Sequence, residues 1–589
     1  MKKILLVALG LSTIFTSCKN VLDIEDLQSL DEEKVWKDPN LVNAYMANLY
    51  TVFGNWSAGA DVYSEQLVGV PFQLNTISPT AGGFKTWDYT NIRKINTAIQ
   101  KVQESSSLSQ EVKNSTLGEA YFLRAFVYFD MVRLYGGIPY ITVPQDQATD
   151  DLNSPRNSTK ESFELLVKDL DEAIKLLPQT IEKSSSNYGR IDGNFAAAFK
   201  AKVLLYKASP QFNPSNPYNN AYWKEANAAN KAAYDQLIKN NYALTTDYAN
   251  ITLQEKGPEV VFAVINTYPN KVAAWDYGVR PGSESRGPAG SVPTWDFVKE
   301  FPMKDGKLYS DPTGKYFKSD DDFLQSYWMN RDPRFEKSIV WNGKVYEVSG
   351  KAGKRQYTSL GIADALDNFG INPAAGINST NQDRYSGFFI LKNSKLSLKQ
   401  TEVETQYDVD FVLMRLAEVM LNYAETANET GDLGTAQDML SQLRKRAGIE
   451  AGTDGKYGIT ATNRDQMREA ILAERNIELC FEGHRFWDLR RSRKLNTLDK
   501  GTKFGVEAIA IEANGAEMDI KQANTLAKTY QLKEANFKYS ILQVPKNGVK
   551  VSEVPDTYYF FPIQQSIIDR NPKVLQNKDW GGEFNPSME

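Results

Sequence analysis

The chain has 589 residues, of which 41% are hydrophobic and 24% charged, and its formal net charge at pH 7 is −5. This composition is typical of a soluble globular body, and a chain of this length can bury a sizeable core without disulfides. The mild, unclustered acidity argues against nucleic-acid binding. With His484 as its single histidine, the chain almost entirely lacks the imidazoles that histidine zinc sites and Ser-His-Asp triads need. With no Walker loop or GxGxxG element either, we expect no cofactor and no metal.

Residues 1–17, MKKILLVALGLSTIFTS, have the basic start, short apolar run and small residues of a secretory signal peptide. The apolar run is too short to span a membrane. The cleavage site ends on Cys18, as in a bacterial lipobox, although Phe15 stands where Leu is more common. We therefore expect lipid on Cys18 to anchor the protein to a membrane. The alternative is an ordinary signal peptide followed by an incidental cysteine. Lipid on Cys18 would leave Cys480 as the only free thiol.

From Asn40 to about Tyr242, apolar residues recur at helical spacing. The pattern predicts helices in 41–53, 90–103, 115–137, 161–177, 194–209 and 221–239. The third of these is apolar on most of its surface, so we expect it to be buried on most sides. On that helix Arg124 faces away from the polar stripe, which predicts a buried ion pair with a carboxylate from elsewhere.

Between about Ile251 and Val409 the chain is rich in glycine, proline and aromatic residues, with short strand-like runs such as EVVFAVI and SGFFILK. We expect an irregular, loop-rich subdomain here, and residues 275–295 contain too much glycine and proline to predict a helix. Helical periodicity returns at 411–448, where two amphipathic helices flank Gly431-Asp432. This arrangement is close to the helix pair of a tetratricopeptide repeat, which stacks on its neighbours to bury its apolar faces.

Five stretches in chain order resemble the SusD/RagB family of outer-membrane lipoproteins. They are FLRAFVYFDMVRLYGGIPY (122–140), PTWDFVKEFPMKDGK (293–307), RLAEVMLNYAETANETGD (415–432), ERNIELCFEGHRFWDLRR (474–491) and YYFFPIQQSIIDRNPKVLQN (558–577). The resemblance implies a mainly α fold, in which four tetratricopeptide-like helix pairs form a scaffold and an irregular subdomain carries the binding face. We divide the chain into signal peptide 1–17, N-terminal helical region 18–250, irregular binding subdomain 251–409 and C-terminal region 410–589.

The resemblance also implies a function. Such a protein binds glycan on the outer face of the outer membrane and delivers it to a partner, a SusC-like TonB-dependent transporter. Peptide capture, which some members of this family perform, is the alternative. A weaker alternative is a glycosidase that uses carboxylates alone; the preferred interpretation is that the protein is not an enzyme.

Aromatic side chains are the candidate ligand-binding residues, because the apolar face of a sugar ring stacks on flat aromatic rings. Relatives carry the binding face in loops ahead of the PTWDF segment, which points to Trp275 and Tyr277 as the platform, with Trp87 and Arg280 in support. Trp295, Trp328, Trp56, Tyr63 and Phe84 are further candidates. For any one of these rings, packing into the core is an equally good interpretation.

Several charged groups are better explained by structure than by chemistry. Glu474, Glu478, Glu482 and Arg485 share one helix stripe, which suggests a catalytic carboxylate row, but pairing with Arg475 and Arg485 is the preferred interpretation. His484 is expected to be structural. The run 320–322 (DDD) lacks the spaced oxygen ligands of a calcium loop, so we expect a solvated helix start.

Overall fold

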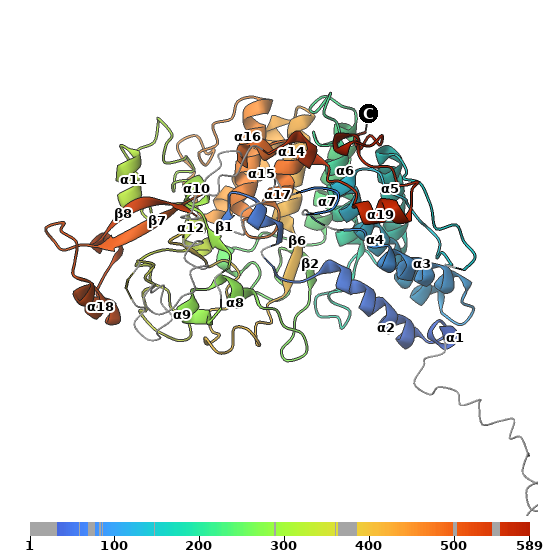
Figure 1. Cartoon of the computed structure of the whole chain (residues 1–589), viewed down its shortest axis with the longest axis horizontal. Coiled ribbons are helices and arrows are strands. Elements are labelled where there is room, and N and C mark those ends of the chain that lie inside the picture. The colour runs from blue at the N-terminus through green and yellow to red at the C-terminus, as the bar shows by residue number, and fades with distance from the viewer. Residues whose placement is uncertain are drawn as a thin grey trace, which may run out of the picture.

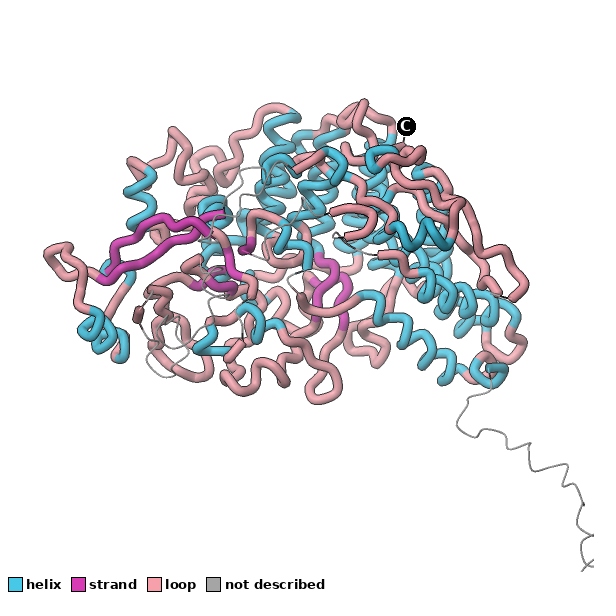
Figure 2. The backbone as a smooth tube through the Cα atoms, in the orientation of Figure 1, coloured by secondary structure: helices cyan, strands magenta, loops and turns pink. Residues whose placement is uncertain are grey.

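Helices dominate the two ends of the chain, and loops with short strands dominate its middle, in the computed structural model of this protein (Figures 1 and 2). The structure describes residues 32–588, except 58, 69–76, 82–83, 85, 147, 288–289, 360, 363–385, 499–502 and 545–553. Cys18 and the signal peptide lie outside the described residues.

The N-terminal region consists of helices where the periodicity predicts them, and most of them pack against the next helix in the chain. After the short α1 (Glu32–Val35) they are α2 (Pro39–Leu49), α3 (Tyr89–Glu104), α4 (Gln110–Tyr135), α5 (Thr159–Leu176), α6 (Gly193–Ala208) and α7 (Tyr222–Lys239). Polar caps fix where they begin: Ser158 and Glu161 form a reciprocal capping box at α5. The central helix α4 is buried on most sides, which confirms the prediction from its sequence.

The stack of helices continues across the irregular segment. Helix α14 (Leu416–Glu429) packs against α7 and α6, and α15 (Leu433–Ala447) and α16 (Arg464–Glu478) pack against α14. A short α17 (Arg485–Arg491) follows. The tetratricopeptide-type pair at 411–448 is therefore confirmed, except that its first five residues form strand β6 (Phe411–Arg415) instead of helix. They do so because β2 (Val260–Val264) pairs with them antiparallel, a partner distant in sequence.

The middle of the chain is irregular, as expected, but it contains short helices. They are α8 (Trp275–Val279), α9 (Gly282–Ser285), α10 (Trp295–Glu300), α11 (Asp320–Ser326) and α12 (Pro333–Ser338). Two-residue strand pairs join β1 (Leu67–Val68) to β3 (Val292–Pro293) and β4 (Ile339–Val340) to β5 (Phe389–Ile390). The expectation that 275–295 contains no helix was wrong, because a one-turn helix needs little intrinsic propensity when tertiary contacts bury it. The run 320–322 lies in the first turn of α11, as predicted.

The C-terminal part first forms a long hairpin and then returns to the N-terminal helices. Strands β7 (Lys503–Ala510) and β8 (Phe537–Val544) pair antiparallel, with α18 (Ile520–Lys528) between them, and project away from the helical end (Figure 1). Helix α19 (Gln565–Arg570) then lies beside the N-terminal helices (Figure 1). Gly136, at φ +79°, ends α4. A side chain would not fit at this position, because an added Cβ would lie 2.6 Å from the carbonyl oxygen of Pro586. The C-terminal segment therefore closes over the end of α4.

Two large apolar clusters form the core. One lies among the helices, and the other lies in the irregular region and includes Trp275 and Trp295. Trp275 is 3% exposed, its ring centroid lies 5.3 Å from that of Trp56, and its indole N–H donates to the Lys392 carbonyl. Trp295 stacks on Phe323 at 5.5 Å. These tryptophans hold the irregular region together where regular secondary structure is sparse.

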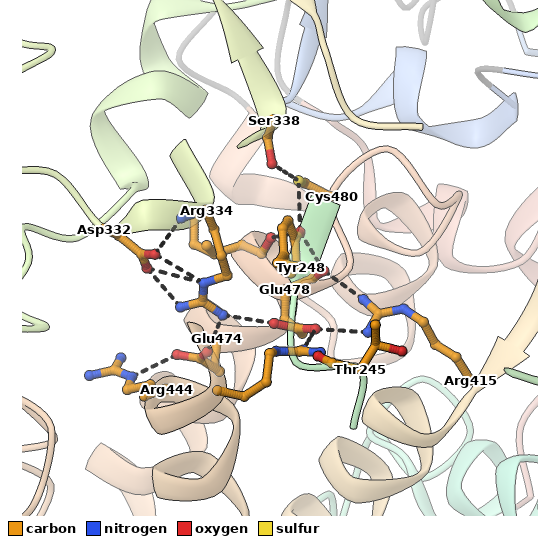
Figure 3. Close-up of polar contacts among 12 residues, drawn as sticks. Thr245, Tyr248, Asp332, Arg334, Ser338, Arg415, Arg444, Glu474, Glu478 and Cys480 are labelled. Atoms are coloured by element: carbon orange, nitrogen blue, oxygen red, sulfur yellow. Dashed lines mark hydrogen bonds and ion pairs between the residues drawn. The ribbon is translucent and has the colours of Figure 1, made fainter. Parts of the chain in front are cut away.

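A buried network of charges joins this region to the helices (Figure 3). At its centre Glu478 of α16 accepts hydrogen bonds from Arg334 of α12 at 2.9 Å, Arg415 of β6 at 2.7 Å and Arg446 of α15. All of these side chains are at most about one-twentieth exposed. Five carboxylates and five cations take part: Glu259, Asp332, Glu474, Glu478 and Glu482 with Arg334, Lys392, Arg415, Arg444 and Arg446.

The structural interpretation of the carboxylate row is thus confirmed, but its partners differ from those expected. Arg475 pairs with Asp488 at 2.8 Å, and Arg485 pairs with Glu65. The glutamates instead bind arginines from other elements, because these pairs form across helix packing and not along one helix. Arg124 forms its predicted buried ion pair, with Asp169 at 2.6 Å.

Acid should weaken this network. Burial alone would raise the pKa of Glu482, but the charges of Arg415 and Lys392 outweigh it and lower that pKa to about 2. The unfolded carboxyl has a pKa of about 4.3. The stabilisation by Glu482 is therefore complete above about pH 5 and is lost as the pH falls toward 2. His484 also makes the fold less stable in acid. Burial lowers its pKa to about 4, so the fold loses stability as the pH falls from about 6.5 toward 4.

We predict that Trp275→Ala lowers the free energy of unfolding by about 3–5 kcal/mol, because it empties a large site in the core. Denaturant titration measures this loss. Trp275→Phe, which keeps a ring in the site, should cost less. An unchanged unfolding free energy in Trp275→Ala would mean that this ring does not support the core.

We predict that Glu482→Gln lowers the free energy of unfolding by about 3–5 kcal/mol at pH 7, because it removes the negative charge that pairs with the buried cations of Arg415 and Lys392. Between pH 6 and pH 3 the gap to the wild type should narrow by about 1–2 kcal/mol, since the wild-type carboxyl begins to lose its advantage. Denaturant titrations at the two pH values measure both effects. The surface control Glu450→Gln should have an unfolding free energy within about 0.5 kcal/mol of the wild type at both pH values. If the difference between Glu482→Gln and the wild type did not change with pH, the lowered pKa of Glu482 would be contradicted.

Candidate functional site

A groove of about 720 Å³ lies between α3, the segment 139–154 and α19, with α2 at one end. Three aromatic side chains line it: Tyr45, Trp87 and Tyr89. Polar side chains that can bond hydroxyl groups share the lining, namely Thr90, Thr97, Gln145, Ser154 and Asn571. This mixture of flat apolar surface and neutral hydrogen-bonding groups is characteristic of small-molecule sites.

Trp87 is placed by the start of α3. Asp88 is the N-cap of this helix, and its carboxylate accepts from the Asn91 backbone N–H at 3.0 Å. The cap fixes the chain just ahead of the helix, so the half-buried Trp87 ring packs edge-on against Tyr135 at 5.6 Å. The ring of Tyr89 lies 5.5 Å from that of Trp87. One side of the Trp87 ring is thus supported by the core while the residue lines the groove.

A second wall, segment 139–154, is irregular and is held in place by buried polar groups. Asn96, on the inner side of α3, donates to the carbonyls of Ile141 at 3.0 Å and Val143 at 3.2 Å. The hydroxyl of Tyr128 donates to the Ile141 carbonyl at 2.9 Å and accepts from the Ile141 N–H at 2.8 Å. The wall therefore has a defined position without being part of a sheet.

The ion pair between Arg124 and Asp169 supports this wall. Arg124 donates to the carbonyl of Thr142 at 3.1 Å and to the side-chain oxygen of Asn96 at 2.9 Å, while Asp169 accepts from the hydroxyl of Tyr140 at 2.7 Å. Burial opposes the charge on Arg124, but the bonds to Asp169 hold its pKa above the ordinary value. The guanidinium stays charged and bridges the helices to the wall.

The third wall comes from the far end of the chain. Asn571, just after α19, donates to the Ser154 carbonyl at 3.0 Å, and Lys573 pairs with Asp151 at 2.9 Å. These contacts tie the C-terminal segment to the wall segment 139–154. The groove is complete only when residues separated by over 400 positions have packed together.

Most of the nine candidate ligand-binding residues lie outside the lining of this groove, and four of them are buried. Trp56, Trp275, Trp295 and Arg280 are between 0% and 9% exposed. Arg280 pairs with Asp276 and donates to the Leu398 carbonyl at 3.0 Å. The structure places these four side chains in the interior and so favours the core interpretation for them, because the irregular region has few regular elements to supply a core.

The other candidates are half-buried. Tyr277 and Trp328 border the apolar cluster of the irregular region, and Tyr63 and Phe84 border that of the helices. Of the nine candidates, Trp87 lines the groove. Tyr45 and Tyr89, which line it as well, were missed. The sequence of α3 did contain a signal for this groove. Polar residues recur on one face of the helix, and the buried isoleucines lie on the other, which marks the polar face as exposed. The polar residues are Thr90, Arg93 and Thr97, and the isoleucines are Ile92, Ile95 and Ile99.

The part of the chain that the structure describes shows neither a metal site nor a membrane-spanning helix. Its acidic, cysteine and histidine side chains form no cluster of three or more with metal-binding geometry. Its helices are all too short or too polar to cross a bilayer.

Comparison with known proteins identifies the family. A sequence model described as the SusD family matches residues 258–580, more than half of the chain, and one described as "starch-binding associating with outer membrane" matches residues 24–205. The SusD-like protein P38 of Formosa agariphila is 26% identical over 526 residues, which cover 83% of this chain and 90% of that protein.

Solved structures agree in fold. A SusD-like protein of Bacteroides fragilis has a TM-score of 0.68 at 22% identity, with 93% of this chain and 98% of that one covered. A second protein from that organism, described as a SusD-like carbohydrate-binding protein, also has a TM-score of 0.68, at 18% identity, with 92% and 99% covered. The chain therefore belongs to the SusD family.

Proposed function

We propose that this protein binds oligosaccharide in the groove between α3, segment 139–154 and α19. The observation that carries the proposal is the half-buried Trp87 ring, backed by Tyr135, in a groove that also presents neutral polar side chains. A sugar ring offers an apolar C–H face for stacking and hydroxyls for hydrogen bonds, so this lining matches both of its surfaces. The printed descriptions of the second matching family model and of the second B. fragilis structure, starch-binding and carbohydrate-binding, support the same ligand class.

The groove favours sugar over peptide. Peptide capture commonly adds a strand through main-chain hydrogen bonds. In the wall segment the carbonyls of four residues already accept bonds from side chains of α3 and α4; these residues are Pro139, Ile141, Thr142 and Val143. Little of this main chain is left to pair with an extended peptide.

Binding without chemical conversion is the proposed activity. Glycosidases use two carboxyl groups that flank the scissile bond. Among the described residues that line the groove none is acidic, and the glutamates of α16 are buried and bound to arginines. The groove thus offers a surface for capture and no acid–base pair.

The location and partner are proposed on the same basis. Lipid on Cys18 would hold the protein at the outer membrane, facing the exterior, and the family description "associating with outer membrane" supports that site. A captured glycan then needs a route inward. We assign that step to a SusC-like TonB-dependent transporter, to which this protein would deliver its ligand.

We predict that Trp87→Ala weakens oligosaccharide binding by about 5- to 150-fold, which corresponds to the roughly 1–3 kcal/mol lost with an anchor aromatic. Calorimetric titration against a panel of polysaccharides measures the affinity, and chromatography of the recovered sugar checks that it is not shortened. Because Trp87 is half-buried, a thermal melt must show that the variant is folded.

The matched control is Trp328→Ala, since Trp328 is also a half-buried tryptophan but lies outside the groove lining. It should bind as the wild type does. A loss confined to Trp328→Ala would move the site to the irregular region, and shortened sugar would establish an enzyme.

We predict that Cys18→Ala releases the protein from the membrane fraction, because attachment depends on acyl chains buried in the bilayer. In the same experiment, mild detergent should recover the wild type together with a large barrel transporter. A Cys18→Ala protein that still needs detergent would contradict the anchor. Repeated recovery of the wild type alone, from cells growing on its glycan, would contradict delivery to a transporter.

A further inference from the structure

The charged side chains that line the groove are all cationic. They are Arg93 and Lys94, on α3, and Arg570, at the end of α19. The chain as a whole has more acidic than basic residues, 73 against 68. The surface of such a protein normally mixes positive and negative side chains. The groove differs, because cations lie on two of its walls and none of its described lining residues is a carboxylate.

The structure shows few partners for these cations among the residues that it describes. In the described part of the chain no carboxylate forms an ion pair with Arg93, Lys94 or Arg570. Arg570 makes one neutral contact, donating to the carbonyl of Ser566 at 3.0 Å. Stability therefore does not account for their presence on the groove.

Nearby acidic groups are occupied elsewhere. Asp88 accepts from Asn91 at the start of α3, and Asp569 accepts from Gln565 at 2.8 Å on α19. Asp151 is paired with Lys573 across the wall and α19 segments. Among the described residues, neither these carboxylates nor Asp146 and Asp150 of segment 139–154 form an ion pair with the cations of the lining.

We infer that the ligand is an acidic oligosaccharide, one whose sugar units carry carboxylate or sulfate groups. This inference rests on the proposed function and specifies its ligand. Trp87 would stack on the apolar face of one unit, and Arg93 and Lys94 on one wall with Arg570 on another would meet the anionic groups. Arginine is suited to this role because its planar fork binds carboxylate and sulfate-like oxygens in pairs. A neutral glycan would need none of these charges.

Titration with matched sugars tests this inference. One pair is a uronic-acid oligosaccharide and its carboxyl-reduced counterpart; the other is a sulfated oligosaccharide and its desulfated counterpart. We expect at least one acidic member to bind on the order of tenfold tighter than its neutral counterpart. Its affinity should fall as salt is raised from 0.05 to about 0.5 M, because salt screens exposed charges. The pair that shows the difference identifies the anionic group.

Two triple variants separate charge in the groove from charge in general. Arg93→Gln/Lys94→Gln/Arg570→Gln should abolish the preference for the acidic sugar while leaving its neutral counterpart nearly unaffected. The control Lys521→Gln/Lys528→Gln/Lys538→Gln removes the same charge from exposed residues of α18 and β8, and should keep the preference. Equal loss in both triple variants would show an effect of net charge and overturn the inference.

The remaining outcomes distinguish this inference from the proposed function. Neutral and acidic sugars that bind equally well, with affinity lost in Trp87→Ala, would overturn the acidic ligand and keep the groove as a glycan site. Failure of the folded wild type to bind any member of either pair or of the polysaccharide panel would overturn both.

Discussion

The structure depends on the buried charge network around Glu478. Helix α16 supplies Glu478, while the arginines that bind it come from α12, β6 and α15, so four elements of the chain meet at one point. Removing so many charges from water is costly, and the cost is offset only when every partner is present in good geometry. The network therefore contributes little net stability, and its main effect is to select one packing of the irregular region. Few other packings would pair all ten buried charges.

At the other end of the molecule a second buried ion pair has a similar role on a smaller scale. Arg124 and Asp169 hold α4, α5 and the wall segment 139–143 together, and through Asn96 they reach α3. The C-terminal segment closes the same region from outside. The groove is rigid because the buried polar groups behind it satisfy the main chain of an irregular wall. This leaves the outward side chains of α3 and α19 available for a ligand.

The two halves of the molecule use aromatic residues differently. In the irregular region Trp56, Trp275 and Trp295 form the core, since short one-turn helices and two-residue strands bury little surface themselves. Among the N-terminal helices apolar residues at helical spacing already fill the core, and Trp87, ahead of α3, is left at the edge. An aromatic residue in a loop is thus a poor indicator of a site where loops must supply the core.

The sequence by itself determined the helices, the tetratricopeptide-type pair and the family, because helical periodicity and motif order are local properties. It also indicated that Arg124 would be paired and that Trp87 was a candidate. Only the tertiary structure decided which carboxylate Arg124 meets, which arginines bind Glu478 and which aromatic rings are buried. These depend on contacts between residues far apart in the chain. The groove, built from α3, the 139–154 wall and α19, and its positive lining exist only after those contacts form.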